Sequence, residues 1–179
     1  MLTADTITAL VGSAVGVALA IIMTVILDRL WPPLLRREFT VELPLDKAWQ
    51  HLARVEEWPS WARHIKQVEL QPAGELGLGS TGRMLLTNGL KPAWRVTEFK
   101  PYRNWKWVGG FLWLTVHYDH RFEELNSTQT KLTWVIEAEG FGVSVLGRLF
   151  ANIYSKSLDR AIPLLVEEMN ASSVSLKGR

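Results

Sequence analysis

Residues Thr6 to Leu27 form a run of 22 residues without a charged side chain, TITALVGSAVGVALAIIMTVIL, with Asp5 before it and Asp28 after it. As an α-helix this run would be about 33 Å long at ~1.5 Å per residue, enough to cross a hydrocarbon layer ~30 Å thick. A cleaved secretory signal is the alternative, but such signals place basic residues ahead of a shorter apolar core. No Lys or Arg precedes this run. The sequence therefore predicts one transmembrane helix within residues 1–30.

The basic residues beside the run predict its orientation. Arg29, Arg36 and Arg37 follow it, whereas no basic side chain comes before it. Because Lys and Arg are retained on the cytoplasmic side, we expect a single-pass protein with its N-terminus outside and the rest of the chain in the cytoplasm. Trp31 falls where an interfacial aromatic anchor would lie, and Pro32-Pro33 is expected to end the helix.

Three small residues recur at every fourth position of this predicted helix, Gly12, Gly16 and Ala20. They share one stripe of its surface, and small side chains let a second helix approach closely. Chance is the alternative, since Gly is frequent in membrane helices. The stripe leads to the hypothesis of a transmembrane helix partner, either a second copy of the chain or another protein.

The composition excludes several classes of function. The chain of 179 residues has 20 basic and 18 acidic side chains, a net charge of +2, so we expect no nucleic-acid partner. The absence of cysteine excludes a disulfide framework, a thiol nucleophile and a cysteine-ligated metal. His51, His64, His117 and His120 lack the spacing of a metal site. We therefore expect neither a metal nor a cofactor.

One glycine motif has the letters of a dinucleotide site. Gly77 to Gly82 (GLGSTG) matches G-x-G-x-x-G, a pattern that needs a strand before it and a helix after it. The residues that follow predict a strand instead. We therefore interpret the segment as a loop.

Beyond residue 37 the patterns predict one α+β domain. A strand is expected over Arg37–Leu43, a helix over Leu45–Val55, and a short second helix ending near His64. Asn88-Gly89 is typical of a hairpin. Further strands are predicted over residues 65–71, 82–87, 92–99, 104–108, 112–124 and 131–138.

A long helix is predicted over Val143–Met169. Its apolar stripe consists of Leu146, Leu149, Phe150, Ile153, Leu158, Ala161, Leu165 and Met169. Because no helix interrupts the preceding strands, we expect an antiparallel sheet, with this helix across its inner face and room for a cavity between them. The expected organisation is a transmembrane helix (1–30), a linker (31–37), a folded domain (38–170) and a disordered tail (171–179).

Several segments of the domain resemble one known family. Residues 43–70, LPLDKAWQHLARVEEWPSWARHIKQVEL, combine an apolar-Pro start, a helix with a central Trp, and a Trp-Pro-x-Trp turn before a strand. Similar segments follow at Gly74–Gly82, Trp94–Pro101, Trp107, His120–Phe122 and Lys131–Trp134. Over about residues 38–170 the chain resembles the polyketide cyclase/dehydrase branch of the START-like (SRPBCC) superfamily.

The resemblance implies a helix-grip fold, in which a curved antiparallel sheet wraps around a long C-terminal helix and leaves a deep apolar cavity. The superfamily binds lipids, sterols, polyketides and other hydrophobic molecules. Its members include enzymes, carriers, sensors and partners of other proteins. The fold alone does not choose among these functions.

Alternation along the strands predicts the residues that face the cavity. Leu112, Leu114, Val116, Tyr118, His120 and Phe122 share one face of one strand. His120 beside Tyr118 could act as acid, base or ligand anchor, or could be a core histidine bonded to Tyr or backbone. The predicted ligand-binding residues are Trp105, Trp107, Val116, Tyr118, His120, Phe122 and Trp134. Plain core filling is the alternative for the aromatic residues, and no catalytic residue is assigned.

Three functions are compatible with these patterns. The first is a membrane-tethered binding or carrier protein for a hydrophobic small molecule or a membrane lipid. The second is a non-catalytic accessory subunit of a larger integral-membrane complex, for example a respiratory or photosynthetic one. The third is a cyclase or dehydratase acting through His120 and Tyr118, which is less favoured because no acid–base pair is evident.

Overall fold

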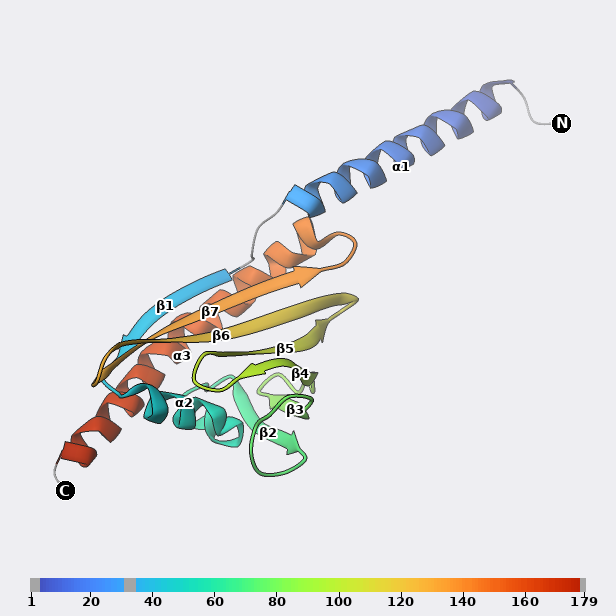
Figure 1. Cartoon of the computed structure of the whole chain (residues 1–179). Helices are drawn as coiled ribbons and strands as arrows, with labels where there is room; N and C mark the ends of the chain where they lie inside the picture. The colour runs from blue at the N-terminus through green and yellow to red at the C-terminus, as the bar shows by residue number, and fades with distance from the viewer. Residues whose placement is uncertain (1–3, 31–34, 178–179) are drawn as a thin grey trace.

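The computed structural model describes residues 4–30 and 35–177, with side chains placed over 12–28 and 35–172. The chain begins with helix α1 (Ala4–Leu30) and ends with the long helix α3 (Val143–Lys177). Between them lie a seven-stranded sheet, helix α2 (Leu45–Ala53) and the 3-10 helix η1 (Val55–Ser60). Figure 1 shows α1 projecting from one end of the body that the sheet and α3 form.

All neighbouring strands of the sheet are antiparallel, in the order β1-β7-β6-β5-β4-β3-β2. Strands β2 to β7 form a meander, and β1 joins the free side of β7 with Leu35 opposite Ile136. The bounds are β1 Leu35–Val41, β2 Ile65–Gln71, β3 Thr81–Leu86, β4 Ala93–Lys100, β5 Asn104–Phe111, β6 Leu114–Asn126 and β7 Gln129–Glu139. The predicted α+β class, with an antiparallel sheet and a long C-terminal helix, is confirmed.

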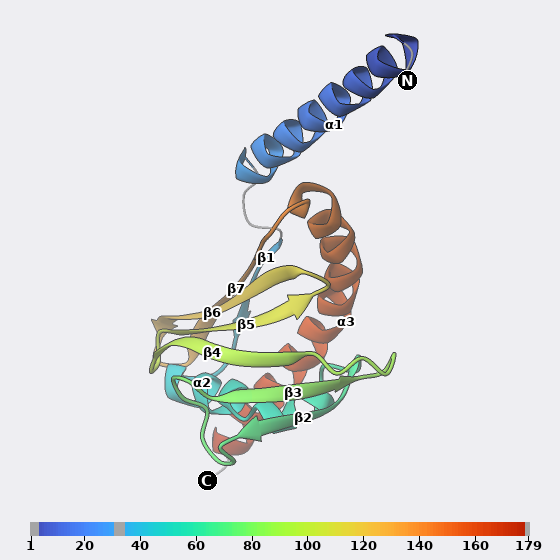
Figure 2. The same ribbon diagram turned by 90° about the vertical axis from the view of Figure 1, so that its right-hand side faces the viewer.

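Helix α3 crosses one face of the curved sheet, which Figure 2 shows from the side. Every second residue of each strand faces this helix, because successive side chains point to opposite faces of a sheet. The C-terminal half of α3 fills the layer with Ala161, Leu165 and Met169, which are almost inaccessible. Helix α2 adds Trp49, whose indole packs against strands β5 and β6. The architecture is that of a helix-grip fold.

Helix α3 differs from its prediction in length and in the side chains that it buries. It continues to Lys177, whereas the sequence predicts a disordered tail over residues 171–179. Ser172 Oγ donates a hydrogen bond to the Glu168 carbonyl at 3.0 Å, so this serine continues the helix without an unpaired hydroxyl. In the predicted apolar stripe, Leu149 and Ile153 are exposed rather than buried.

The link between β5 and β6 is a turn at Leu112 and Trp113, so the predicted strand begins two residues late, at Leu114. Leu112 has a φ of 56°, a left-handed conformation that no strand residue adopts. In the sequence, Leu112 lies two residues before Leu114 and therefore extends the alternating apolar pattern of the strand. The backbone nevertheless reverses there, and Leu112 is exposed instead of facing the interior.

Helix α1 exposes large apolar side chains around its circumference from Val15 to Leu27. Among the residues that the structure describes, no helix is both long and apolar enough to cross a membrane. The predicted helix is therefore present, while its crossing of a membrane stays a prediction from the sequence. Trp31 and Pro32-Pro33 lie outside the described residues.

Asp28 joins the end of α1 to the beginning of α3. Its carboxylate accepts hydrogen bonds from the backbone N–H groups of Gly142 and Ser144, each at 2.8 Å. The first N–H groups of a helix have no partner within that helix, and a carboxylate is the acceptor that best suits them. The two hydrogen bonds therefore join the end of α1 to the first turn of α3.

Candidate ligand-binding cavity

A cavity of about 670 Å³ lies between the inner face of the sheet and the N-terminal half of α3. The sheet contributes Trp94, Trp107 and Trp134 to its wall, and η1 contributes Trp58. Side chains of α3 close the opposite side, namely Phe150, Ile153, Tyr154, Ser157 and Leu158. The cavity exists because this half of α3 does not fill the layer that its C-terminal half fills.

The structure brings four of the seven predicted site residues together on this wall, namely Trp107, Tyr118, His120 and Trp134. Trp105, Val116 and Phe122 are buried but do not line the cavity. Trp105 packs at 4.9 Å from the ring of Trp49 in α2, and at 5.2 Å from Phe122. Strand alternation identifies the inward face correctly, but it does not tell which part of that face α2 covers.

His120 is enclosed by tryptophan rings. It stacks on Trp105 with centroids 5.2 Å apart and meets Trp134 edge-on at the same distance, with Trp58 at 6.0 Å. Its Nδ1 is buried and has no hydrogen-bond partner among the described residues. Burial away from water disfavours the imidazolium and lowers the pKa of His120 to about 3. His120 is therefore a neutral group at physiological pH.

Tyr118 and Tyr154 form a second aromatic pair on the wall, with ring centroids 5.7 Å apart. Trp107, opposite Tyr118 on the neighbouring strand, stacks on the Tyr118 ring with centroids 3.7 Å apart, and its ring centroid lies 6.4 Å from that of His120. Burial raises the pKa of Tyr118 well above its ordinary value, and it also raises the pKa of Tyr154. Both phenols therefore stay protonated in the cavity.

The accessible wall is apolar even where its residues carry polar atoms. The indole nitrogens of Trp94, Trp107 and Trp134 are covered by neighbouring groups and have no hydrogen-bond partner in the described part of the chain. In contrast, the indole N–H of Trp58 donates to the Leu52 carbonyl at 2.9 Å. What these tryptophans present to the cavity is carbon surface, which suits an apolar guest.

The solvent-exposed polar side chains of the cavity lie at its edge. Asn88 and Lys91, in the loop between β3 and β4, line the cavity and are exposed to solvent. His64 lies on the wall with its ring 6.2 Å from that of Tyr154, and burial lowers its pKa. The site therefore has a largely apolar wall, with exposed polar side chains at the part of its edge formed by the β3–β4 loop.

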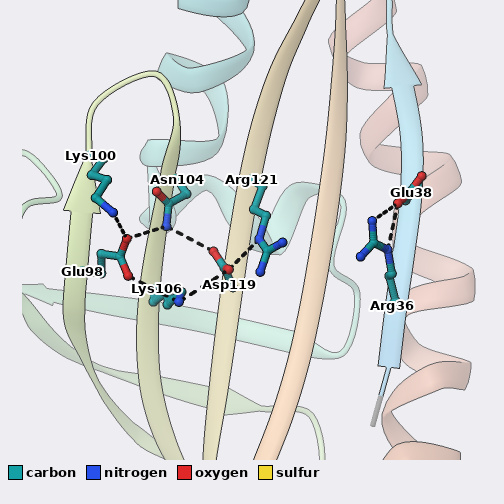
Figure 3. Close-up of polar contacts among 8 residues, drawn as sticks. All are labelled: Arg36, Glu38, Glu98, Lys100, Asn104, Lys106, Asp119 and Arg121. Carbon is teal, nitrogen blue, oxygen red and sulfur yellow. Dashed lines mark hydrogen bonds and ion pairs between the residues drawn. The ribbon is translucent and has the colours of Figure 1, made fainter. Parts of the chain in front are cut away.

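The outer face of the sheet carries charged side chains that already pair with one another (Figure 3). Asp119 accepts a hydrogen bond from Arg121 at 2.7 Å and lies 3.9 Å from Lys106. Hydrogen bonds, first from Lys100 and then from Asn104, hold the pKa of Glu98 down to about 2. Because these charges pair with one another across neighbouring strands, we assign this face to solvation rather than to the site.

Residues 33–164 match the family described as polyketide cyclase / dehydrase and lipid transport. The chain belongs to this family. The resemblance seen in the sequence is thereby confirmed for the family and its fold. A comparison with curated proteins found no match.

Solved structures of low sequence identity share the fold of this chain. A hypothetical protein from Helicobacter pylori aligns at a TM-score of 0.63 and 16% identity, covering 75% of this chain and 86% of the other. Ms6760 from Mycobacterium smegmatis aligns at 0.56 and 18%, covering 76% and 90%. StfQ, a di-domain ARO/CYC of the steffimycin biosynthetic pathway, aligns at 0.60 and 11%, covering 79% of this chain and 51% of its own. Such distant likenesses establish the fold alone.

Sequence reasoning missed the part of the cavity that lies outside strands β5 to β7. Trp58 and Trp61 reach the wall from η1 and the residue after it. On α3, Phe150, Ile153, Tyr154 and Ser157 line it at helical spacing. That i, i+3, i+4, i+7 spacing was the available signal, because it defines the helix face that must meet the sheet.

Proposed function

We propose that the chain binds a hydrophobic small molecule or lipid in the cavity between the sheet and α3, and that α1 tethers this binding domain to a membrane. The observation that carries the proposal is the cavity itself, about 670 Å³ with an aromatic and aliphatic wall. Ligand sites in proteins span about 300–1,000 Å³ and are mostly apolar, with a few polar groups that fix orientation.

The distribution of polar groups favours an amphipathic guest. The apolar part would contact the indole and phenol rings of the interior, where burial of carbon surface contributes about 25 cal/mol per Å². A polar end would lie at the margin beside Asn88 and Lys91, where it keeps contact with water. A membrane lipid has this combination of an apolar body and one polar end.

The apolar character of α1 supports its proposed role as a membrane tether. Its uncharged run is followed by a helix end with Arg29, and its side chains from Val15 to Leu27 are exposed on all sides. A helix that is apolar all round needs apolar surroundings, which a bilayer supplies. Under the positive-inside rule the binding domain would lie in the cytoplasm.

The acid–base properties of the site support binding rather than catalysis. A general acid or base works best with a pKa near the operating pH. The pKa of His120, at about 3, is far below that range, and burial raises the pKa of Tyr118 far above it. Proton transfer between this histidine and this tyrosine would therefore be strongly uphill.

The test compares the full chain with a cavity-filling variant. Ser157 lines the cavity on α3, whereas its neighbour Lys156 is exposed and is not part of the wall. The full chain, Ser157→Trp and Lys156→Trp are purified from native membranes in mild detergent, and their extracts are analysed by mass spectrometry. We expect an apolar molecule with the full chain and with Lys156→Trp, and its loss from Ser157→Trp. Equal recovery from both variants would place the ligand elsewhere, and no co-purifying molecule would contradict the proposal.

The accessory-subunit alternative depends on the stripe of Gly12, Gly16 and Ala20. An added Cβ at Gly12 or Gly16 would meet nothing within 4 Å, so there is room beside both glycines for another helix. Migration of the detergent-extracted chain on a native gel tests this alternative. A band that corresponds to the 20.3 kDa chain alone would contradict it.

A further inference from the structure

Six large apolar side chains are exposed together at one end of the domain, and we call this surface the apolar rim. Their exposed fractions are Leu112 69%, Trp113 64%, Phe141 56%, Val145 69%, Leu149 52% and Ile153 58%. Soluble surfaces seldom gather so much apolar area at one place unless it meets a partner or a membrane. The rim therefore requires an occupant.

The rim is built from three segments that meet. Leu112 and Trp113 come from the β5–β6 turn, Phe141 from the β7–α3 loop, and the remaining three from α3, where they recur every fourth residue. Trp113 Nε1 donates to the Phe141 carbonyl at 2.9 Å, which fixes the turn to the loop. Leu112 is held outward by a left-handed backbone, a conformation that costs a non-glycine residue about 1–2 kcal/mol. Strain of this kind persists where the surrounding structure imposes it, and it gathers at functional sites.

The end of α1 lies at the same place. Asp28 is the first charged residue after the uncharged run, and its carboxylate binds the backbone of Gly142 and Ser144 beside Phe141 and Val145. If α1 crosses a bilayer, Asp28 lies at the bilayer surface. The β7–α3 loop must then lie at the same depth, because two 2.8 Å hydrogen bonds join it to Asp28.

We propose that the apolar rim inserts into the headgroup region of the bilayer that anchors α1, and that the cavity opens directly to lipid. The inference rests on the proposed tether and adds a second membrane contact to it. Leu112 and Ile153 belong to both the rim and the cavity wall, so the surface that enters the lipid is also the mouth of the site. A ligand could then pass from bilayer to cavity without crossing water.

The absence of cysteine allows the depth of single positions to be measured. Cysteine replaces Leu112, Val145, Val17 or Leu125 in the full chain, and each variant carries an environment-sensitive fluorophore in phosphatidylcholine vesicles. Lipids with quenchers at graded acyl positions then report depth. Leu125 is the matched control, an exposed leucine at the opposite end of β6 from Leu112. Val17 lies within α1 and tests the tether by itself.

We expect the fluorophores at 112 and 145 to lie about 5–10 Å within the headgroup and acyl boundary, as interfacial apolar groups do. The fluorophore at 17 should lie deeper, and that at 125 should remain in water. Quenching at 17 but not at 112 and 145 would overturn the rim inference and leave the tether intact. No quenching at 17 would overturn both. Protection of 112 and 145 from aqueous iodide without lipid quenching would assign the rim to a protein partner or a second copy, and would also overturn the inference.

Discussion

At the scale of single residues, two of the three glycines in the G-x-G-x-x-G segment have a structural reason, a different one for each. Gly79 has a φ of +83°, whereas Gly77 has open space around it. A Cβ on Gly82 would come within 2.1 Å of the Glu69 carbonyl and 2.3 Å of the Trp94 ring. Gly82 begins the inward face of β3 opposite Trp94, so its missing side chain is what lets that indole lie flat and form the cavity wall. The motif is a coincidence of letters.

Replacing Gly82 by alanine should therefore destabilise the domain. The new Cβ overlaps a backbone carbonyl, which cannot move freely, and overpacking of this kind costs about 1–3 kcal/mol. Urea unfolding followed by circular dichroism measures the change. Gly77→Ala is the matched control, and we expect it to leave the midpoint almost unchanged. Equal stability of both variants would show that β3 and Trp94 adjust without cost.

His120 should make folding sensitive to acid. Its pKa is about 3 in the folded chain and near 6.5 in an unfolded one, so between these values only the unfolded chain binds the proton. The free energy of unfolding therefore falls as pH falls from 6.5 toward 3, by up to about 1.4 kcal/mol per pH unit. Denaturant titrations at a series of pH values measure this slope.

His120→Phe should flatten that acid dependence, because phenylalanine has no proton to gain and keeps a ring among the tryptophans. His64→Gln is the companion variant, since burial also lowers the pKa of His64 and part of the slope belongs to it. An unchanged slope in His120→Phe would mean that water reaches His120 in the folded chain.

At the scale of secondary-structure elements, the sequence located most strands and helices because their patterns are local. Alternation placed β2 at residues 65–71, in agreement with Ile65–Gln71. The same pattern was wrong at Leu112, where a reversal of the backbone leaves no mark in hydrophobicity. The predicted site contained strand residues only, and it left out the residues that η1 and α3 contribute to the wall. It also included Trp105 and Phe122, which α2 covers, because that cover depends on long-range packing. Neither the exposure of Leu149 and Ile153 nor the cap by Asp28 can be read from local pattern.

The Asp28 cap should control the start of α3. Removing a capping side chain typically costs about 1 kcal/mol, so Asp28→Ala should increase amide exchange at Ser144 about fivefold. Asp46→Ala, in the exposed first turn of α2, is the control and should leave Ser144 unaffected. Unaltered exchange in Asp28→Ala would mean that other groups hold this helix start.

At the scale of the whole molecule, the domain is divided into a filled half and a hollow half. Leu165 and Met169 close the layer at the C-terminal end of α3, whereas the cavity occupies its N-terminal end. The hollow half also carries the apolar rim and the contact with α1. The tightly packed core and the cavity therefore lie at opposite ends of one helix, and the less densely packed end is the one that contacts α1.

This division predicts that a bound ligand supplies packing that the hollow half lacks. Any molecule that binds only the folded state stabilises it, by about 2.7 kcal/mol at a hundredfold excess over Kd. For a chain of this size, losing this stabilisation when the lipid is extracted should lower Tm by roughly 5–10 °C. Thermal unfolding of the full chain in detergent, before and after lipid extraction, measures the shift, and native lipid extract should restore it. Ser157→Trp, with its cavity filled, should unfold at a temperature that extraction does not change, whereas Lys156→Trp should follow the natural chain. A Tm that is indifferent to extraction in the natural chain would mean that no extractable molecule occupies the cavity in the folded protein, and would contradict this prediction.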